Sequence, residues 1–406
     1  MTSENGFAEV AYYDLPERRL ALAGATLSRR LENGKGVWRL ELPRPSGEPL
    51  RVEQLGGPAT PPAEVRRLLP AFLRGSGPEL VLRLRVHEDE AEVLEGQHST
   101  RTLAIENGET AAAALGLVQE PSEHGDDAIG RLRAMLELQY AQILHHDPGV
   151  RLDLDPEDVH GVRVAVRRSR AVLRAARPML DRAWSEPLRD ELKWLGGSLG
   201  RRRDADVLVG RLRQQIEQLD QPERSAAGAL VELLAEERET AQAIALDALK
   251  SDRYYHLLDA LEAAARGPRV RRGEVSLDRL ARREFERLRK VAEQLGPDAS
   301  DAALHRARIL GKRARYTAEL AEPEVGKPAR RFVACAKALQ DVLGAHQDAI
   351  VAEARLRGLL ADVPSSGAAF AAGRLVERER ARRREARAEL PKAWRALKRS
   401  ARAAWG

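Results

Sequence analysis

The feature that most restricts the fold of this chain is an internal repeat in its C-terminal two-thirds. The run Val159-His160-Gly161-Val162-Arg163-Val164 matches the run Leu304-His305-Arg306-Ala307-Arg308-Ile309, and basic residues follow each histidine at +3, +7, +8 and +10. These basic residues are Arg163, Arg167, Arg168 and Arg170 in the first copy and Arg308, Lys312, Arg313 and Arg315 in the second. Self-similarity at a long period predicts two copies of one supersecondary unit.

The repeat continues beyond the basic residues. Five residues separate Lys193 from Leu199-Gly200 in the first copy, and five residues separate Lys337 from Leu343-Gly344 in the second. From about residue 126 onward, apolar residues recur at i, i+3 and i+4 between short Pro and Gly breaks, which is typical of helices. The predicted helices are 126–146, 156–178, 186–217, 223–250, 277–295, 299–321, 328–360 and 367–404. We therefore expect two tandem four-helix bundles related by a pseudo-twofold axis, repeat one at 126–265 and repeat two at 274–406.

The first part of the chain has a different pattern. Residues 25–31 and 37–42 alternate in polarity on either side of a turn, which predicts a β-hairpin. Further strands are predicted at 80–86 and 91–96, and a short helix at 63–72. We expect a small α+β or partial β-barrel domain at 1–118 and an all-α domain at 120–406. The fold class of the whole chain is therefore α+β.

Charge differs between these two parts. Residues 1–119 contain 14 Lys and Arg against 17 Asp and Glu, while residues 120–406 contain 54 against 45. A polyanionic partner is therefore sought in the second part. The single cysteine excludes a disulfide framework and a multi-cysteine metal site. Because no run approaches about 20 apolar residues and the N-terminus has no secretion-signal pattern, we expect a cytoplasmic protein with no membrane partner.

Two predicted helices carry cations and no carboxylate. Residues 159–180 contain six Arg, and residues 302–318 contain five Lys and Arg, with no Asp or Glu in either segment. A solvated helix gains stability from opposite charges at i, i+4 and loses it from like charges. On a helix, His160, Arg163, Arg167, Arg170 and Arg174 share an arc of about 80°. Self-repulsion in both repeats indicates that an anion completes the site.

A linear phosphate chain fits these cations best. Residues one helical turn apart present donors about every 5 Å, and arginine forks bind phosphate oxygens in pairs. Aromatic residues make up only 4% of the chain and none lies in the first basic segment, which leaves few platforms for base stacking. Nucleic acid stays an alternative partner. No set of residues has metal-ligand spacing, so we expect no metal and no other cofactor.

The repeat residues resemble a known family, the conserved histidine α-helical domain, or CHAD. Its two motifs are similar to Val159-His160-x-x-Arg163-Val164-x-x-Arg167-Arg168-x-Arg170-x-x-Leu173-Arg174 and Leu199-Gly200-Arg201-Arg202-Arg203-Asp204-Ala205-Asp206-Val207, and Leu343-Gly344-Ala345-His346-Gln347-Asp348 resembles the weaker second copy. The resemblance covers roughly residues 120–406. It implies two four-helix bundles around a basic pore that binds inorganic polyphosphate, a link with polyphosphate granules, and no catalytic residues.

The binding residues expected on these grounds come from both copies. They are His160, Arg163, Arg167, Arg168, Arg170, Arg174, Lys193, Arg202, Arg203, His305, Arg308, Lys312, Arg313, Arg315, Lys337 and His346. The second copy departs from the first, because Glu319 stands where Arg174 stands and Ala345 and Gln347 replace Arg201 and Arg203. We therefore expect the second copy to contact fewer phosphates.

The N-terminal segment resembles the CYTH, or triphosphate tunnel, fold in degenerate form. The matching stretch is Tyr12-Tyr13-Asp14-Leu15-Pro16-Glu17-x-Arg19-Leu20-x-x-Ala23-Gly24-x-Thr26-Leu27-x-Arg29-Arg30. Active members of the family open with a strand of alternating Glu and a Lys, which this chain lacks, and Glu41 stands where a Lys is usual. Glu106 is what remains of a later acidic pair, and Glu88, Glu90 and Glu92 alternate as a substitute cluster. Metal-dependent phosphoryl transfer needs several convergent carboxylates. We expect no triphosphatase activity, with a metal-dependent triphosphatase as the alternative.

Overall fold

A computed structural model gives the structure of the chain. It describes residues 8–32, 34–45, 47–86, 90–95, 98–104, 125, 127–271, 276–360, 363 and 365–406. The chain forms two compact units, each made of several segments. The first unit comprises Met1–Glu123, Leu138–Ala165 and Leu246–Asp259, and the second comprises His124–Glu137, Val166–Ala245 and Ala260–Gly406. The predicted domain boundary at 118–120 and the predicted start of repeat two at 274 lie outside the described residues, so that division stays a prediction.

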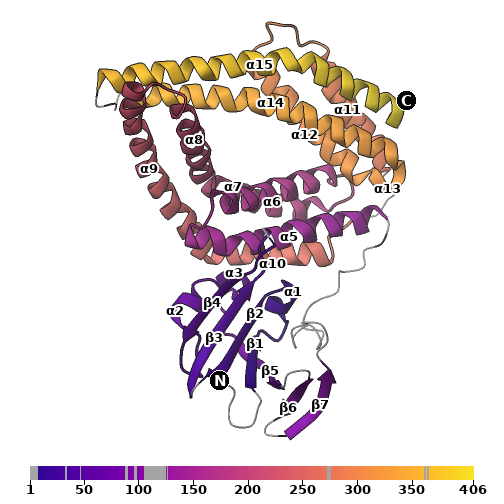
Figure 1. The fold of residues 1–406 in the computed structure, drawn as a ribbon. Coiled ribbons are helices and arrows are strands. Elements are labelled where there is room, and N and C mark those ends of the chain that lie inside the picture. Colours follow the sequence, from indigo (N-terminus) through magenta and orange to yellow (C-terminus); the bar gives the residue numbers. More distant parts are fainter. Residues whose placement is uncertain are drawn as a thin grey trace. The chain divides into compact units, whose positions relative to one another are not determined.

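The first unit contains a seven-stranded antiparallel sheet (Figure 1). Its strands are β1 (Ala8–Asp14), β2 (Thr26–Glu32), β3 (Lys35–Leu42), β4 (Leu50–Leu55), β5 (Glu79–Val86), β6 (Glu90–Glu95) and β7 (His98–Ala104). The strand order is β4-β3-β2-β1-β5-β6-β7. The predicted hairpin is confirmed, with Thr26 opposite Glu41 and Glu32 opposite Lys35. On β3, Trp38, Leu40 and Leu42 alternate with outward side chains and are fully buried, which is the period of a half-buried strand.

Three short helices accompany the sheet. They are α1 (Arg19–Leu22), α2 (Ala63–Arg66) and α3 (Pro70–Leu73). The single helix predicted at 63–72 is therefore two helices, because Pro70 has no amide hydrogen with which to continue the hydrogen-bond ladder. Buried Asp14 stabilises the start of α1, since its carboxylate accepts hydrogen bonds from the amides of Leu20 and Ala21, both at 3.0 Å.

Arginines of the strand-rich segment contact carboxylates on the helical segments of the same unit. These segments come from α5 (Ala128–Leu152), α6 (Pro156–Ala175), α9 (Gln221–Lys250) and α10 (Asp252–Arg266). Arg44 lies 3.1 Å from buried Asp158, whose other oxygen lies 3.0 Å from His146 Nδ1. Arg19 and Arg74 both contact Asp259, at 3.2 and 2.5 Å. The first unit is therefore joined by ion pairs as well as by its sheet.

The second unit is helical. Besides parts of α5, α6, α9 and α10, it contains α7 (Arg182–Ser198), α8 (Gly200–Ile216), α11 (Leu277–Ala292), α12 (Asp301–Leu320), α13 (Glu322–Val325), α14 (Lys327–Leu359) and α15 (Ser366–Trp405). Helices α14 and α15 lie side by side (Figure 1). One core joins them to α8 and α9 through fully buried leucines, among them Leu212, Leu230, Leu356 and Leu375. Near the C-terminus, Phe332 packs edge-on against Trp405 with ring centres 4.4 Å apart.

The α+β fold class is confirmed, with differences at particular helices. Helix α5 continues through Pro148 to Leu152, because buried Asp147 binds Arg151 and the Tyr254 hydroxyl and ties this turn into the fold. The helix predicted at 186–217 is two helices that meet at Leu199, and the first of them begins at Arg182. Asp181 caps it by accepting from the Ala183 amide. Helix α10 was not predicted. In the part of the chain that is described, no helix is long and apolar enough to cross a membrane.

Candidate functional site

A cavity of about 610 Å³ lies within the second unit, among α6, α7, α11 and α12. Its lining is strongly cationic. The charged lining residues are Arg167, Arg170, Arg174, Arg177, Arg182, Arg189, Arg271, Arg283, Arg287, Lys312, Arg313 and Glu284. Among the described residues, eleven cationic side chains thus share this space with one carboxylate. We call this site the arginine cavity.

Helical periodicity places most of these cations. Arg167, Arg170 and Arg174 are spaced i, i+3 and i+7 on α6 and therefore share one face. On α11, Arg283 and Arg287 are spaced i, i+4. The acid-free segments of the two repeats both reach the cavity, since α6 supplies three cations and α12 supplies Lys312 and Arg313.

A backbone bridge between two loop segments brings in one more arginine. Leu180 and Val270 form an isolated antiparallel bridge. Beside it, the amide of Asp181 donates to Arg269 O at 2.9 Å and the amide of Arg271 donates to Met179 O at 2.8 Å. These bonds hold the chain after α10 against the α6–α7 loop, and Arg271 thereby lines the cavity.

The remaining lining is largely apolar. It comprises Ala171, Ala175, Pro178, Leu280, Ile309, Tyr316 and Thr317. Apolar walls lower the local dielectric, so charges in the cavity interact more strongly than they would in water.

Several of the cavity cations have acidic partners. Arg177 lies 2.8 Å from Glu186, which also binds Arg189, and Arg287 binds Glu284. In contrast, the Nε atoms of Arg170 and Arg313 are buried and have no hydrogen-bond partner among the described residues. Buried polar groups are nearly always hydrogen-bonded in proteins. Unsatisfied donors on two facing helices indicate a site for an acceptor with several oxygens.

Repulsion among the cations lowers their pKa values. The pKa of Lys312 is lowered to about 8, mainly by burial and in addition by the charges of Arg308 and Arg167, against an opposing effect of Asp348. Burial also lowers the pKa of Arg174, as do the charges of Arg313 and Arg189. Arg167 of the first repeat thus acts on Lys312 of the second, and Arg313 acts on Arg174. The two basic segments face each other across the cavity.

Five of the predicted binding residues line the cavity. They are Arg167, Arg170, Arg174, Lys312 and Arg313. Arg308 lies one turn before Lys312, acts on its charge, and has a buried Nε without a hydrogen bond. His160 and Arg163 lie in the first half of α6, which belongs to the other unit, and Arg168 is a half-buried residue of α6 outside the lining.

Two predicted arginines are held in buried networks instead. Arg202 is fully buried, and its Nε donates to Asp206 at 3.1 Å, one turn along α8, while Gln242 accepts from Nη1. Arg315 donates to Glu319 at 2.8 Å and to Gln340 at 2.9 Å. In both cases the i, i+4 carboxylate neutralises the cation, so these guanidiniums stabilise the helices and do not line the cavity.

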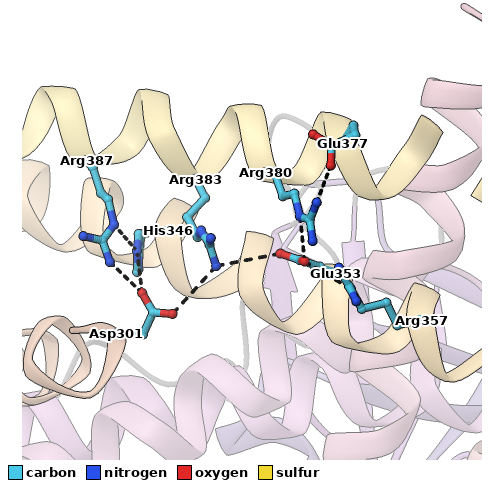
Figure 2. A network of polar contacts seen from close by, with 8 residues as sticks. All are labelled: Asp301, His346, Glu353, Arg357, Glu377, Arg380, Arg383 and Arg387. Atoms are coloured by element: carbon cyan, nitrogen blue, oxygen red, sulfur yellow. Dashed lines mark hydrogen bonds and ion pairs between the residues drawn. The ribbon is translucent and has the colours of Figure 1, made fainter. Parts of the chain in front are cut away.

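His346 is also placed away from the cavity, in a network of α12, α14 and α15 (Figure 2). Arg387 Nε donates to His346 Nε2 at 3.1 Å, so that nitrogen is an acceptor and the ring is neutral. Burial lowers the pKa of His346, and the charge of Arg387 lowers it further, against the opposing effect of Asp301. His346 therefore contacts an arginine in this network and does not line the arginine cavity, and its predicted phosphate contact stays a prediction.

The other predicted residues are distributed over the surface. Lys193 and Lys337 are exposed on α7 and α14, and Arg203 is half-buried on α8. His305 is exposed, with its Nδ1 3.0 Å from Gln347 Oε1. None of these four lines the arginine cavity. The structure therefore does not gather the whole predicted set in one place.

Six cavity arginines were not predicted as binding residues. They are Arg177, Arg182, Arg189, Arg271, Arg283 and Arg287. On α7 and α11, arginines alternate with acids such as Glu186 and Glu284, so a search for acid-free segments passes over them. The i, i+4 spacing of Arg283 and Arg287 could have predicted that they share a helix face. No local sequence pattern predicts the bridge that positions Arg271.

The candidate carboxylates of the strand-rich segment are tied to arginines or exposed. Glu41 lies 3.1 Å from Arg51 on the neighbouring strand, and Glu92 lies 3.5 Å from Arg85. Glu90 is exposed, and Glu88, Asp89 and Glu106 lie outside the described residues. Within the described ranges, no three His, Cys, Asp or Glu side chains gather as metal ligands would.

Comparisons with known proteins point to one family. A family model described as the CHAD domain matches residues 134–357. Two Mycobacterium tuberculosis proteins, Uncharacterized protein MT2285 (strain CDC 1551 / Oshkosh) and Uncharacterized protein Rv2226 (strain ATCC 25618 / H37Rv), are each 27% identical over 86% of this chain and 81% of their own length.

Solved structures agree with that match. PptA from Streptomyces chartreusis is similar with a TM-score of 0.54 and 26% identity, over 68% of this chain and 100% of its own. The CHAD domain from the plant Ricinus communis is similar with a TM-score of 0.51 and 27% identity, over 70% of this chain and 97% of its own. The strand-rich N-terminal segment is compatible with a CYTH-like domain.

Proposed function

Because this chain belongs to the CHAD-domain family, as the match to residues 134–357 shows, we propose that its arginine cavity binds inorganic polyphosphate. The observation that supports the proposal most is the imbalance, in the described lining, of eleven cationic side chains against one carboxylate around about 610 Å³. A phosphate chain supplies repeated negative charge and many acceptor oxygens. Arginine forks recognise such oxygens bidentately and remain charged at every physiological pH.

The unsatisfied donors favour a ligand that reaches both helices at once. Arg170 Nε on α6 and Arg313 Nε on α12 are both buried without a hydrogen bond in the described part of the chain. A single orthophosphate satisfies a few neighbouring donors, whereas a chain of linked phosphates spans opposite walls. Long-chain polyphosphate is therefore the form we expect to bind most tightly.

Nucleic acid is the alternative partner, and the lining favours it less. The described lining contains one aromatic side chain, Tyr316, and the guanidinium of Arg315 lies 4.8 Å from the centre of its ring. Proteins that bind single strands stack successive bases on several aromatic side chains. A ligand without bases makes better use of this wall. A protein with this function would meet its ligand at polyphosphate granules, and that location is part of the proposal.

The proposal is tested by titrating the full chain with long-chain polyphosphate at several salt concentrations. Release of counterions makes the logarithm of the affinity fall linearly with the logarithm of the salt concentration, by about a thousandfold between about 50 and 200 mM salt for six phosphate contacts. Orthophosphate at equal total phosphate and single-stranded RNA of equal charge are the controls. Absence of binding to polyphosphate, or tighter binding to the RNA, would overturn the proposal.

We also propose that the chain has no triphosphatase activity. Its support is that Glu41 and Glu92 are each engaged by an arginine, at 3.1 and 3.5 Å, so they do not converge on a shared metal. The test is phosphate release from ATP or tripolyphosphate with Mg²⁺ or Mn²⁺. Turnover that disappears in Glu90→Gln or Glu106→Gln would show that the N-terminal segment is an enzyme.

A further inference from the structure

Lys312 differs in kind from the other cations of the arginine cavity. The described lining contains ten arginines and this one lysine. A guanidinium keeps its proton in proteins, whereas a lysine ammonium loses it on burial and becomes a nucleophilic amine. Lys312 is therefore the lining cation at which covalent chemistry can remove the charge.

The neighbours of Lys312 favour its neutral form. Arg308 and Arg315 on α12 and Arg167 on α6 repel its proton, and Asp348 on α14 is the acid that opposes them. Together with burial, these charges bring the pKa of Lys312 to about 8. At pH 8 about half of such an amine is unprotonated, against about 0.4% for an amine with the pKa of about 10.4 that lysine has in a peptide.

The same surroundings attract small anions. Arg167 lines the cavity with Lys312, and so does Arg313, whose buried Nε lacks an acceptor among the described residues. A phosphate group bound by these guanidiniums would lie beside an amine that is partly unprotonated. Donors fixed in a site of low dielectric also stabilise charge that develops on a leaving group.

We propose that Lys312 is a modification site that accepts acyl groups from small acyl phosphates. The amine of Lys312 attacks the carbonyl carbon of the bound acyl phosphate and forms a C–N bond. The bond between the carbonyl carbon and the oxygen that links it to phosphorus breaks. Orthophosphate leaves, and the nitrogen releases a proton to solvent. No oxidant or further reactant is needed, and the product is an N-acylated, uncharged lysine.

Acylation of Lys312 acts on the cavity as a whole. It removes one positive charge from a wall where Arg167, Arg308 and Arg315 surround that charge. The modified protein then holds polyanions with one cation fewer, so the slope of log affinity against log salt becomes shallower by about 0.7 to 0.9. The modification is a way to weaken anion binding in proportion to the supply of acyl phosphate.

The test is to incubate the full chain with acetyl phosphate at pH 8, without any enzyme, and to follow each lysine by quantitative mass spectrometry. Lys290 and Lys337 are the reference sites, because both are exposed lysines of the same unit outside the lining. We expect the initial rate at Lys312 to exceed theirs by about tenfold, since its larger unprotonated fraction is offset in part by a weaker nucleophile. Uncharged acetic anhydride should show a smaller preference for Lys312.

Two results would overturn the proposal. One is acetylation of Lys312 by acetyl phosphate no faster than that of Lys290, and the other is an equal preference with acetic anhydride, which would mean that the cavity does not gather the anionic reagent. Added polyphosphate should slow the reaction at Lys312 and leave Lys290 unchanged if both ligands share the cavity. If Lys312 reacts preferentially while the titration detects no polyphosphate binding, the modification site stands and the proposed function falls.

Discussion

The arginine cavity and the arginine row of α15 contain the same residue type in opposite electrostatic states. In the row, Arg380, Arg383 and Arg387 face Asp301 and Glu353 (Figure 2). Arg387 lies 2.7 Å from Asp301, and Arg380 lies 2.9 Å from Glu353. In the cavity, the described lining has eleven cations and one carboxylate. In the row the arginines pair with carboxylates of the protein, whereas in the cavity we propose that they bind a ligand.

The pKa shifts of the two regions show the same contrast. Burial would raise the pKa of Glu353, but the charges and hydrogen bond of its arginine partners bring that pKa below its ordinary value. In the cavity, burial and neighbouring arginines lower the pKa of Lys312 and of Arg170. Charges of the row therefore stabilise one another, whereas those of the cavity repel. The number of arginines in a region therefore does not distinguish the two roles. The number of carboxylates close to those arginines does.

The largest effect should come from removing the unsatisfied cavity donors. Arg170→Ala combined with Arg313→Ala should weaken polyphosphate binding by about a hundredfold at low salt, because each hydrogen bond to a charged group contributes about 1.5 kcal/mol. The measurement is the dissociation constant by calorimetric titration, with helicity checked by circular dichroism.

The matched control for that variant lies in the row. Arg380→Ala with Arg383→Ala lowers the net charge by the same two units, but both residues already have carboxylate partners. Its affinity should stay within about threefold of the unchanged protein, since both arginines lie outside the cavity lining and are already paired with Glu353. Equal losses in the two double variants would mean that overall charge, and not the cavity, holds the ligand.

The next largest effect is a dependence on pH. The pKa of Lys312 is about 8 in the folded protein, below the value of about 10.4 in an unfolded chain. Between these values the unfolded chain binds more protons, so this group makes the free protein more stable as pH rises. A bound polyanion restores the proton, so binding takes up protons above pH 8 and weakens with rising pH.

The affinity for polyphosphate should therefore fall by about tenfold from pH 7 to pH 9 at constant ionic strength, which is the effect of one linked proton. Titrations in buffers of different ionisation enthalpy measure the proton uptake directly. Lys312→Arg should abolish both the pH dependence and the proton uptake. Their persistence in that variant would assign the titration to another group.

For the free energy of unfolding we expect the opposite ranking: substitutions in the α15 row should cost more than substitutions in the cavity. Asp301 lies in the first turn of α12 and contacts Arg383 and Arg387. Asp301→Asn should therefore lower the free energy of unfolding by about 1 kcal/mol through the lost helix-terminal charge and ion pairs. Arg170→Ala with Arg313→Ala should leave it unchanged or raise it, because it relieves repulsion. Urea unfolding measures both, and a large loss in the cavity variant would make its arginines structural.

Local sequence signals predicted much of the fold, although strands β1, β4 and β7 were not predicted. The alternation in 25–42 predicted the β2–β3 hairpin, and the helical period predicted α6, α12, α14 and α15 within a few residues. Tertiary contacts decided the rest. The buried cluster around Asp147 carries α5 past Pro148, and a single residue, Ser251, separates α9 from α10 while its hydroxyl accepts from the Tyr254 amide.

The site was predictable only where a segment lacks acids. That criterion found Arg167, Arg170, Arg174, Lys312 and Arg313. It passed over the arginines of α7 and α11, because acidic residues lie near them in the sequence. In the described structure, those acids do not pair with each of these arginines. It also counted Arg202 and Arg315 as ligands, although the carboxylates Asp206 and Glu319 stand at i+4 and bind them. Checking each cation for an acid at i+4 would have separated these two from the cavity set.

The smallest effect should come from Glu284, the one carboxylate in the described lining of the cavity. It binds Arg287, raises the pKa of Arg174, and has a buried Oε2 without a hydrogen bond in the described structure. A polyanion in the cavity meets Glu284 as a like charge, so Glu284→Gln should strengthen polyphosphate binding by about threefold, the usual scale of a single partly screened charge.

The matched control for Glu284→Gln is Glu286→Gln, because Glu286 lies on the same helix, pairs with Arg289 at 2.6 Å and is outside the lining. That variant changes the net charge equally and should leave the affinity unchanged. If Glu284→Gln instead weakens binding, the carboxylate holds Arg287 in its binding position. The cavity would then rely on pairing in the way the α15 row does, and the contrast between the two regions would narrow to the arginines of α6 and α12.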